Sequence, residues 1–270
     1  RWEEAYMALG DTYHHLLPSH GDLLGLARSS FDAALDADST FTPAFRHRAE
    51  IAFRDGDLER GETLLRRLVT LGADSQGVRG LRIMAACLRQ NESWKTLAIA
   101  DPFIALGAAW TLAAGGLQSH CAEALYRQLL GTKNLSSSYS WTALVGLTGS
   151  LISRNRAAEA IALVDSAIAG GAPAGIFLYF LTSGEAPVLE PKARAAAALV
   201  LGSHGPDYAT SAPHTRLAIG AWHARHGDTA MVAKLARQAE AEAAGGDRRL
   251  RLIADALEAH AALARADTSA

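Results

Sequence analysis

The sequence has few prolines, few cysteines and no long β-branched runs. Its 270 residues include 8 prolines and 2 cysteines, and alanine-rich stretches dominate. Few helix breakers and many good helix formers predict an all-α fold. Cys87 and Cys121 lie far apart and form no C-x-x-C pair, so we expect neither a disulfide framework nor a zinc site. We interpret both cysteines as small buried hydrophobic residues.

Motifs that carry enzymatic chemistry are also missing. The chain has no GxxxxGK[ST] loop, no GxGxxG turn, no HExxH helix, no GxSxG elbow and no SxxK pair. We therefore expect no catalytic residue and no cofactor, and we do not expect an enzyme. The formal net charge of -2 gives no basic face, which argues against a nucleic-acid partner.

One apolar stretch, Leu97 to Gly116, is long enough to raise the question of a membrane span. Asp101-Pro102 interrupts it and glycines dilute it, so a buried helix is the better interpretation and we expect no membrane partner. Charge is sparse around it. Only eight of the 86 residues from Ala98 to Ser183 are charged, whereas 20% of the residues in the whole chain are charged. This predicts either a surface that packs against something outside the chain or thicker internal packing.

Two helical hairpins are predicted between Tyr6 and Leu71, because small and aromatic residues recur there at helical spacing. In the first hairpin these residues are Tyr6, Leu9, Gly10 and Tyr13, then Ala27, Phe31 and Ala34. The last three recur 34 residues later as Gly61, Leu65 and Leu68, beyond a predicted turn at Asp55-Gly56-Asp57. Gly10 and Ala27 would let the paired helices approach closely, with Tyr6, Tyr13 and Phe31 filling the remaining volume.

The helical period continues to the end of the chain, although the spacing pattern weakens. We expect one array without separate domains, organised as clear repeats (1–75), divergent repeats (76–140), a further repeat (141–172), an irregular helical segment (173–212) and a repeat with a capping helix (213–270). The polar stretch Gly131 to Ser140 is predicted to be a loop. Tryptophans such as Trp110 are interpreted as core residues.

Polar residues on the first helices of the two clear hairpins form the candidate site. They are Glu4, Asp11, His14, His15, Arg46, His47, Glu50 and Arg54. Residues three or four apart share a helix face, so we expect these side chains to meet in one groove. Three interpretations stay open: arginines that hold a peptide carboxylate or carbonyls, a metal site of histidines and a carboxylate, or a network that fixes the angle between hairpins. The leading interpretation assigns no metal ligand.

The pattern from Tyr6 to Ala34 resembles tetratricopeptide repeats. The strings Leu9 to His14 and Arg46 to Glu50 are also similar to the repeat region of bacterial serine/threonine kinases and winged-helix activators. The resemblance implies a right-handed α-solenoid and a cytoplasmic docking or sensor domain of a larger signalling protein. Its concave face would bind a protein or peptide, or an effector domain preceding Arg1. The alternative is a sensor that binds a small molecule or metal in the groove.

Overall fold

The computed structural model describes residues 2–16, 23–73, 75–114, 119–171 and 213–265. These residues form helices and turns and include no strand, which confirms the all-α class predicted from the sequence. The chain divides into two compact units, each described by itself below.

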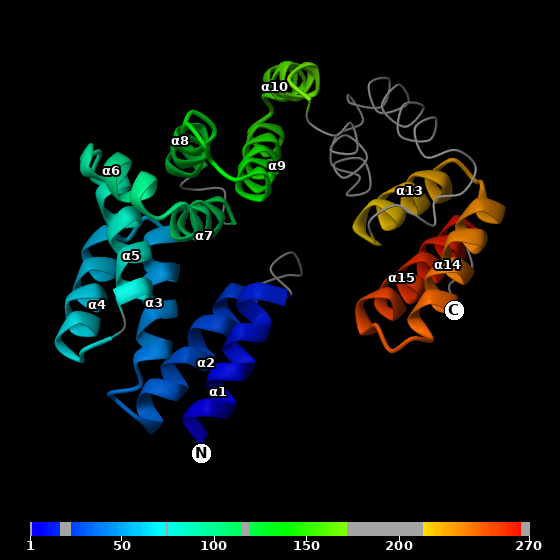
Figure 1. Ribbon diagram of the computed structural model, residues 1–270. Coiled ribbons are helices and arrows are strands. Elements are labelled where there is room, and N and C mark those ends of the chain that lie inside the picture. The colour runs from blue at the N-terminus through cyan, green and yellow to red at the C-terminus, as the bar shows by residue number, and fades with distance from the viewer. Residues whose placement is uncertain (1, 17–22, 74, 115–118, 172–212, 266–270) are drawn as a thin grey trace. The chain divides into compact units, whose positions relative to one another are not determined.

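The first unit, Arg1–Arg154, is a row of helical hairpins (Figure 1). Its helices are α1 (Trp2–Asp11), the π-helical turn η1 (Thr12–Leu16), α2 (Leu23–Ala37), α3 (Thr42–Arg54), α4 (Leu58–Thr70), α5 (Ser75–Leu88), α6 (Ser93–Ala100), α7 (Pro102–Ala113), α8 (Ser119–Leu130) and α9 (Ser137–Ser153). Helices α1, α3, α5 and α7 each pack against the helix that follows. In addition, α3 packs on α5, α5 on α7 and α7 on α9. Helices α3, α5, α7 and α9 therefore form a continuous layer.

The second unit, Asn155–Ala270, contains α10 (Ala157–Ala169), α13 (Pro213–Arg225), α14 (Thr229–Ala243) and α15 (Arg248–Ala264). Helices α13, α14 and α15 pack against one another in all three pairs. The segment that the sequence predicts to be irregular, 173–212, lies outside the described residues. The single uninterrupted array stays a prediction.

Two tight turns between paired helices use the same Gly-Asp sequence. Gly56 and Gly227 adopt φ values of 81° and 76°, which favour glycine. The aspartates that follow them, Asp57 and Asp228, cap the next helix, and each carboxylate accepts a hydrogen bond at 3.1 Å from a backbone N–H three residues ahead. The turn predicted at Asp55-Gly56-Asp57 is thereby confirmed.

Close helix contacts depend on glycine facing an aromatic ring. A Cβ atom added to Gly10 would lie 2.4 Å from the Phe31 ring, and one added to Gly61 would lie 2.4 Å from Phe53. Both phenylalanines are fully buried, so the predicted packing of Gly10 on Phe31 is confirmed. The predicted burial of Tyr6 is wrong, because its side chain is 36% exposed. The nearest atoms to a Cβ added at Gly10 belong to the Phe31 ring, and Tyr13 packs partly buried against the core cluster that contains Phe31.

Two further expectations about the middle of the first unit are corrected. The predicted loop over Gly131–Ser140 is shorter, because α9 already begins at Ser137 and the Ser136 hydroxyl accepts a hydrogen bond from a backbone N–H of its first turn. Trp110 does not fill the core. It lies on α7 with 61% of its surface exposed and lines a groove together with residues of α3, α5 and α9.

The apolar stretch Leu97–Gly116 is divided between α6 and α7 at Asp101, whose carboxylate accepts a hydrogen bond from the Ile104 N–H at 3.3 Å. This carboxylate caps the start of α7 and separates the two apolar helices. In the described parts of the chain, no helix combines the length and the apolar character that crossing a bilayer requires.

The cysteines form a disulfide, so the prediction that both are unpaired is wrong. Cys87 at the end of α5 is bonded to Cys121 at the start of α8, with their Cα atoms 5.8 Å apart. They are separated by 34 residues in sequence. Short-range spacing gives no indication of the pair, because only the packing of successive hairpins brings these helix ends together.

Candidate functional site

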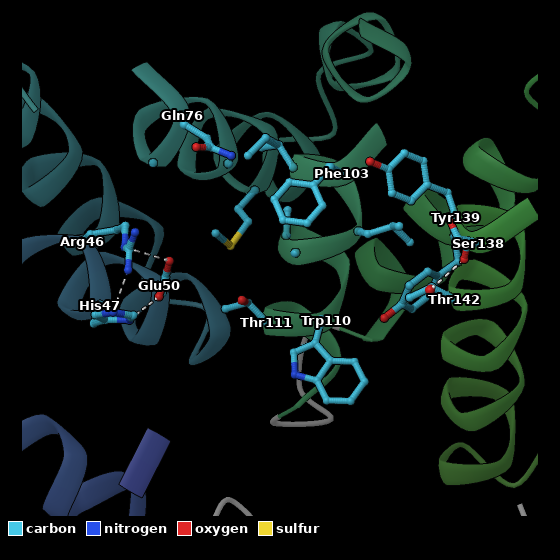
Figure 2. Close-up of a pocket in the computed structure, with 18 residues that line it drawn as sticks. Arg46, His47, Glu50, Gln76, Phe103, Trp110, Thr111, Ser138, Tyr139 and Thr142 are labelled. Carbon is cyan, nitrogen blue, oxygen red and sulfur yellow. Dashed lines mark hydrogen bonds and ion pairs between the residues drawn. The ribbon is translucent and has the colours of Figure 1, made fainter. Parts of the chain in front are cut away.

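The first helices of successive hairpins line a groove of about 710 Å³ (Figure 2). Residues from α3, α5, α7 and α9 contribute to it, together with Tyr126 from α8. Figure 2 shows Arg46, His47 and Glu50 on one side and Tyr139 on the other. The groove lies entirely within the first unit, and its volume suits a small molecule or several side chains of a bound peptide.

The middle of the groove is apolar and open. Phe103 and Trp110 lie about two turns apart on α7 and are 58% and 61% exposed, although large apolar side chains are normally buried. Gly107 on α7 also lines the groove, and a Cβ added there would meet no atom within 4 Å. The charge-poor region identified in the sequence thus presents aromatic surface in this groove.

The polar end of the groove is built by one turn of α3. The Glu50 carboxylate lies 3.7 Å from Arg46 Nε and 2.6 Å from His47 Nδ1. Arg46 Nη2 lies 2.9 Å from His47 Nε2 and donates to it, because a guanidinium has no acceptor. The Asp11 carboxylate at the end of α1 lies 3.3 Å from the same ring nitrogen. Three neighbouring α3 side chains therefore contact one another and one residue of α1.

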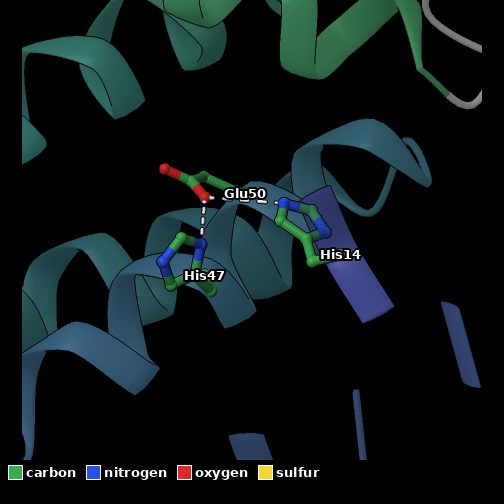
Figure 3. Close-up of side chains that lie close together, drawn as sticks. All are labelled: His14, His47 and Glu50. Atoms are coloured by element: carbon green, nitrogen blue, oxygen red, sulfur yellow. Dashed lines mark ion pairs between the residues drawn. The ribbon is translucent and has the colours of Figure 1, made fainter. Parts of the chain in front are cut away.

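His14 reaches this cluster from the π-helical turn η1. Its Nε2 lies 3.8 Å from Glu50 Oε2, so the carboxylate stands between two imidazoles (Figure 3). The His47 ring stacks on Phe31 at 5.0 Å between centroids, and His14 meets the edge of the same phenylalanine. These core contacts fix both histidines. Together His14, His47 and Glu50 offer three ligand atoms within 4.8 Å of one another.

The protonation of Glu50 follows from its neighbours. Burial by itself raises the pKa of this carboxyl, but the hydrogen bond from His47, the charge of Arg46, and the charges that His47 and His14 carry when protonated together hold the pKa below its ordinary value. Glu50 is therefore an ionised, mostly buried carboxylate. An ionised oxygen at the groove end can accept hydrogen bonds or coordinate a cation.

The structure brings together five of the eight predicted site residues: Asp11, His14, Arg46, His47 and Glu50. The other three do not join them. Glu4 is exposed on α1, about two helical turns before Asp11. Arg54 is only 1% exposed, lies outside the groove lining and has its pKa lowered by burial, so the expectation that it projects into the groove is wrong. The His15 side chain lies outside the described ones.

Sequence reasoning missed the aromatic part of the groove. Phe103, Trp110 and Tyr139 line it, yet aromatic residues on apolar helices are usually core residues. The scarcity of charge between Ala98 and Ser183 was the available signal, but it fitted thicker internal packing as well as an exposed apolar surface.

No protein-family model matches the chain, and neither curated proteins nor solved structures give a significant match.

Proposed function

We propose that the chain is a non-enzymatic docking unit that binds an apolar, aromatic-containing segment of another protein in the groove lined by α3, α5, α7 and α9. The supporting observation is the exposure of Phe103 and Trp110 inside a concave surface of about 710 Å³. Exposed aromatic residues in a groove are the usual anchors of a protein interface. The resemblance to tetratricopeptide repeats supports the same role for the layer of first helices.

Charge in the groove indicates which segment suits it. Among the described residues that line it, Arg46 and Glu50 carry opposite charges and lie 3.7 Å apart. The lining has no unbalanced charge that would attract a strongly charged peptide. Backbone N–H and carbonyl groups of a bound segment could pair with Gln76, Ser138 and Thr142 at the margins. The expected ligand is a short segment with one or two large apolar side chains and few charges.

Gly107 permits a test that leaves the fold intact. A Cβ at this position meets no atom within 4 Å, so Gly107→Leu would direct a side chain into the groove, and glycine is a poor residue for a helix interior. We would select peptides from a random displayed library on the immobilised chain and measure their affinity by fluorescence anisotropy. Selected peptides should contain aromatic or aliphatic anchors. Gly107→Leu should abolish binding, and Trp110→Ala should weaken it by about 10-fold or more.

Ile99→Ala is the matched control, because Ile99 is also exposed but lies on α6 outside the groove lining. It should bind the selected peptides as the unmodified chain does. Peptides that bind Gly107→Leu as tightly as the unmodified chain would place the docking surface elsewhere. A library enriched mainly in charged sequences would contradict the apolar ligand.

A small apolar molecule is the second candidate ligand, favoured by a groove volume in the range of small-molecule sites. Native mass spectrometry of the purified chain separates the two cases. A bound species of defined mass that is lost in Gly107→Leu would favour this sensor function, whereas peptide selection without such a species favours docking.

A further inference from the structure

The geometry points to a binding site for a divalent transition-metal ion of the zinc class, formed by His14, His47 and Glu50 at the polar end of the groove. The site does not rest on the proposed docking function. Its ligand atoms belong to this chain alone, and its test needs no partner. The support comes from the spacing of the ligand atoms, the orientation of His47 and the position of Arg46.

The three ligand atoms nearly match a metal centre. Zinc binds imidazole nitrogen and carboxylate oxygen at about 2.0–2.2 Å, which places two ligands of a tetrahedral ion about 3.4 Å apart. Glu50 Oε2 lies 2.6 Å from His47 Nδ1 and 3.8 Å from His14 Nε2, and all three atoms lie within 4.8 Å of one another. Shifts of about 1 Å would complete the centre. Two imidazoles and one carboxylate suit zinc better than magnesium or calcium, which prefer oxygen.

The surroundings of His47 supply the partner that a ligating imidazole usually has. If Nδ1 binds the metal, the proton must sit on Nε2, where Asp11 Oδ1 lies 3.3 Å away and can accept it. A carboxylate that accepts the distal N–H fixes the tautomer and orients the ring toward the ion. Stacking of the ring on Phe31 holds the same orientation.

Arg46 stabilises the competing, metal-free arrangement. Its Nη2 donates to His47 Nε2 at 2.9 Å, which leaves the ring proton on Nδ1 to be donated to Glu50. Metal binding therefore moves this proton from Nδ1 to Nε2, with no net loss from the ring, and displaces the guanidinium. The Arg46 side chain is 40% exposed, so it can turn toward solvent. Removing its charge and its hydrogen bond should strengthen metal binding.

Three protein ligands leave one tetrahedral position for an exogenous group. His47 and Glu50 both line the groove, so that position is accessible from it. A water molecule or an oxygen or nitrogen of a bound ligand could occupy it.

The test is calorimetric titration of the folded chain with Zn²⁺, with Mg²⁺ as a comparison and Co²⁺ spectroscopy to report coordination. We expect one Zn²⁺ per chain and no measurable Mg²⁺ binding. His14→Ala and Glu50→Gln should weaken Zn²⁺ binding by more than about 100-fold, and Asp11→Asn by about 10- to 100-fold. His223→Ala, which removes a histidine paired with Asp228 in the second unit, should leave the affinity unchanged.

Arg46→Met gives a result of opposite sign and changes a side chain that is 40% exposed, so it tests the site even if the His14 variant does not fold. It should tighten Zn²⁺ binding by about 10-fold or more, since the charge that it removes lies within hydrogen-bond distance of a ligating ring. Circular dichroism confirms that each variant is folded. Failure of the folded chain to bind Zn²⁺, or equal affinity in the Glu50→Gln and unmodified chains, would overturn the site.

Discussion

Identical glycine-to-alanine substitutions in two helices of the first unit should affect stability differently. At Gly10 the new methyl group would lie 2.4 Å from Phe31 Cε1, far inside van der Waals contact. At Gly107 it would meet no atom within 4 Å. Both variants gain about 1 kcal/mol of helix propensity, so this term cancels in the comparison. What remains is the cost of overpacking at Gly10.

That cost should be about 1–3 kcal/mol, because the ring cannot move freely. Phe31 is fully buried, stacks on His47 and meets the edge of His14. Gly107→Ala should therefore raise the free energy of unfolding by up to about 1 kcal/mol, with Gly10→Ala lower than it by about 1–3 kcal/mol. A second substitution, Phe31→Leu, should relieve part of the Gly10→Ala defect.

Urea unfolding followed by far-ultraviolet circular dichroism would measure the difference. Hydrogen exchange of peptides from α1 and α7 would assign each change to its helix and separate local opening from unfolding of either unit. Equal stability of the two alanine variants would refute the close contact between Gly10 and Phe31. Absence of coupling between Gly10 and Phe31 in the double variant would also contradict it.

Two further predictions concern the Cys87–Cys121 bond and Tyr126. Replacing both cysteines with serine should lower the free energy of unfolding by about 4 kcal/mol, because the disulfide restricts a closed loop of this size in the unfolded chain. Detection of two free thiols in the denatured, unreduced chain would contradict the bond. Burial raises the pKa of Tyr126, so its phenol stays protonated in the folded chain while the unfolded chain ionises near pH 10. The free energy of unfolding should therefore decline as pH rises above about 10. Phenolate absorbance should show one tyrosine that ionises only when the chain unfolds. Ionisation of every tyrosine in the folded chain would exclude the burial of Tyr126.

The sequence predicts the local structure well because helix formation depends on near neighbours. Hydrogen bonds four residues apart and caps such as Asp57 are encoded within one or two turns. The hairpin turn at Gly56 follows from this local chemistry. The same reasoning grouped Asp11, His14, Arg46, His47 and Glu50, because they recur on the first helices of adjacent hairpins.

The sequence alone did not give the direction of side chains on helices with little polar contrast. Helix α7 is apolar all round, so its pattern does not show that Trp110 faces the groove while Leu112 is buried. Arg54 presents the opposite case. It is charged and lies on the helix that carries the site, yet it is buried. For these residues the packing of neighbouring helices determines whether the side chain is exposed, and the local sequence pattern does not predict it.

By itself, the sequence determined that this chain is helical, where the turn at Gly56 lies, and that Asp11, His14, Arg46, His47 and Glu50 belong to one candidate group. Only the tertiary structure decided that Cys87 reaches Cys121 and that four first helices enclose a groove with exposed aromatic residues. The physical reason is the sequence separation of the residues that make the contacts. Helices and their turns are specified by contacts within a few residues, whereas the groove and the disulfide depend on the angles at which successive hairpins pack.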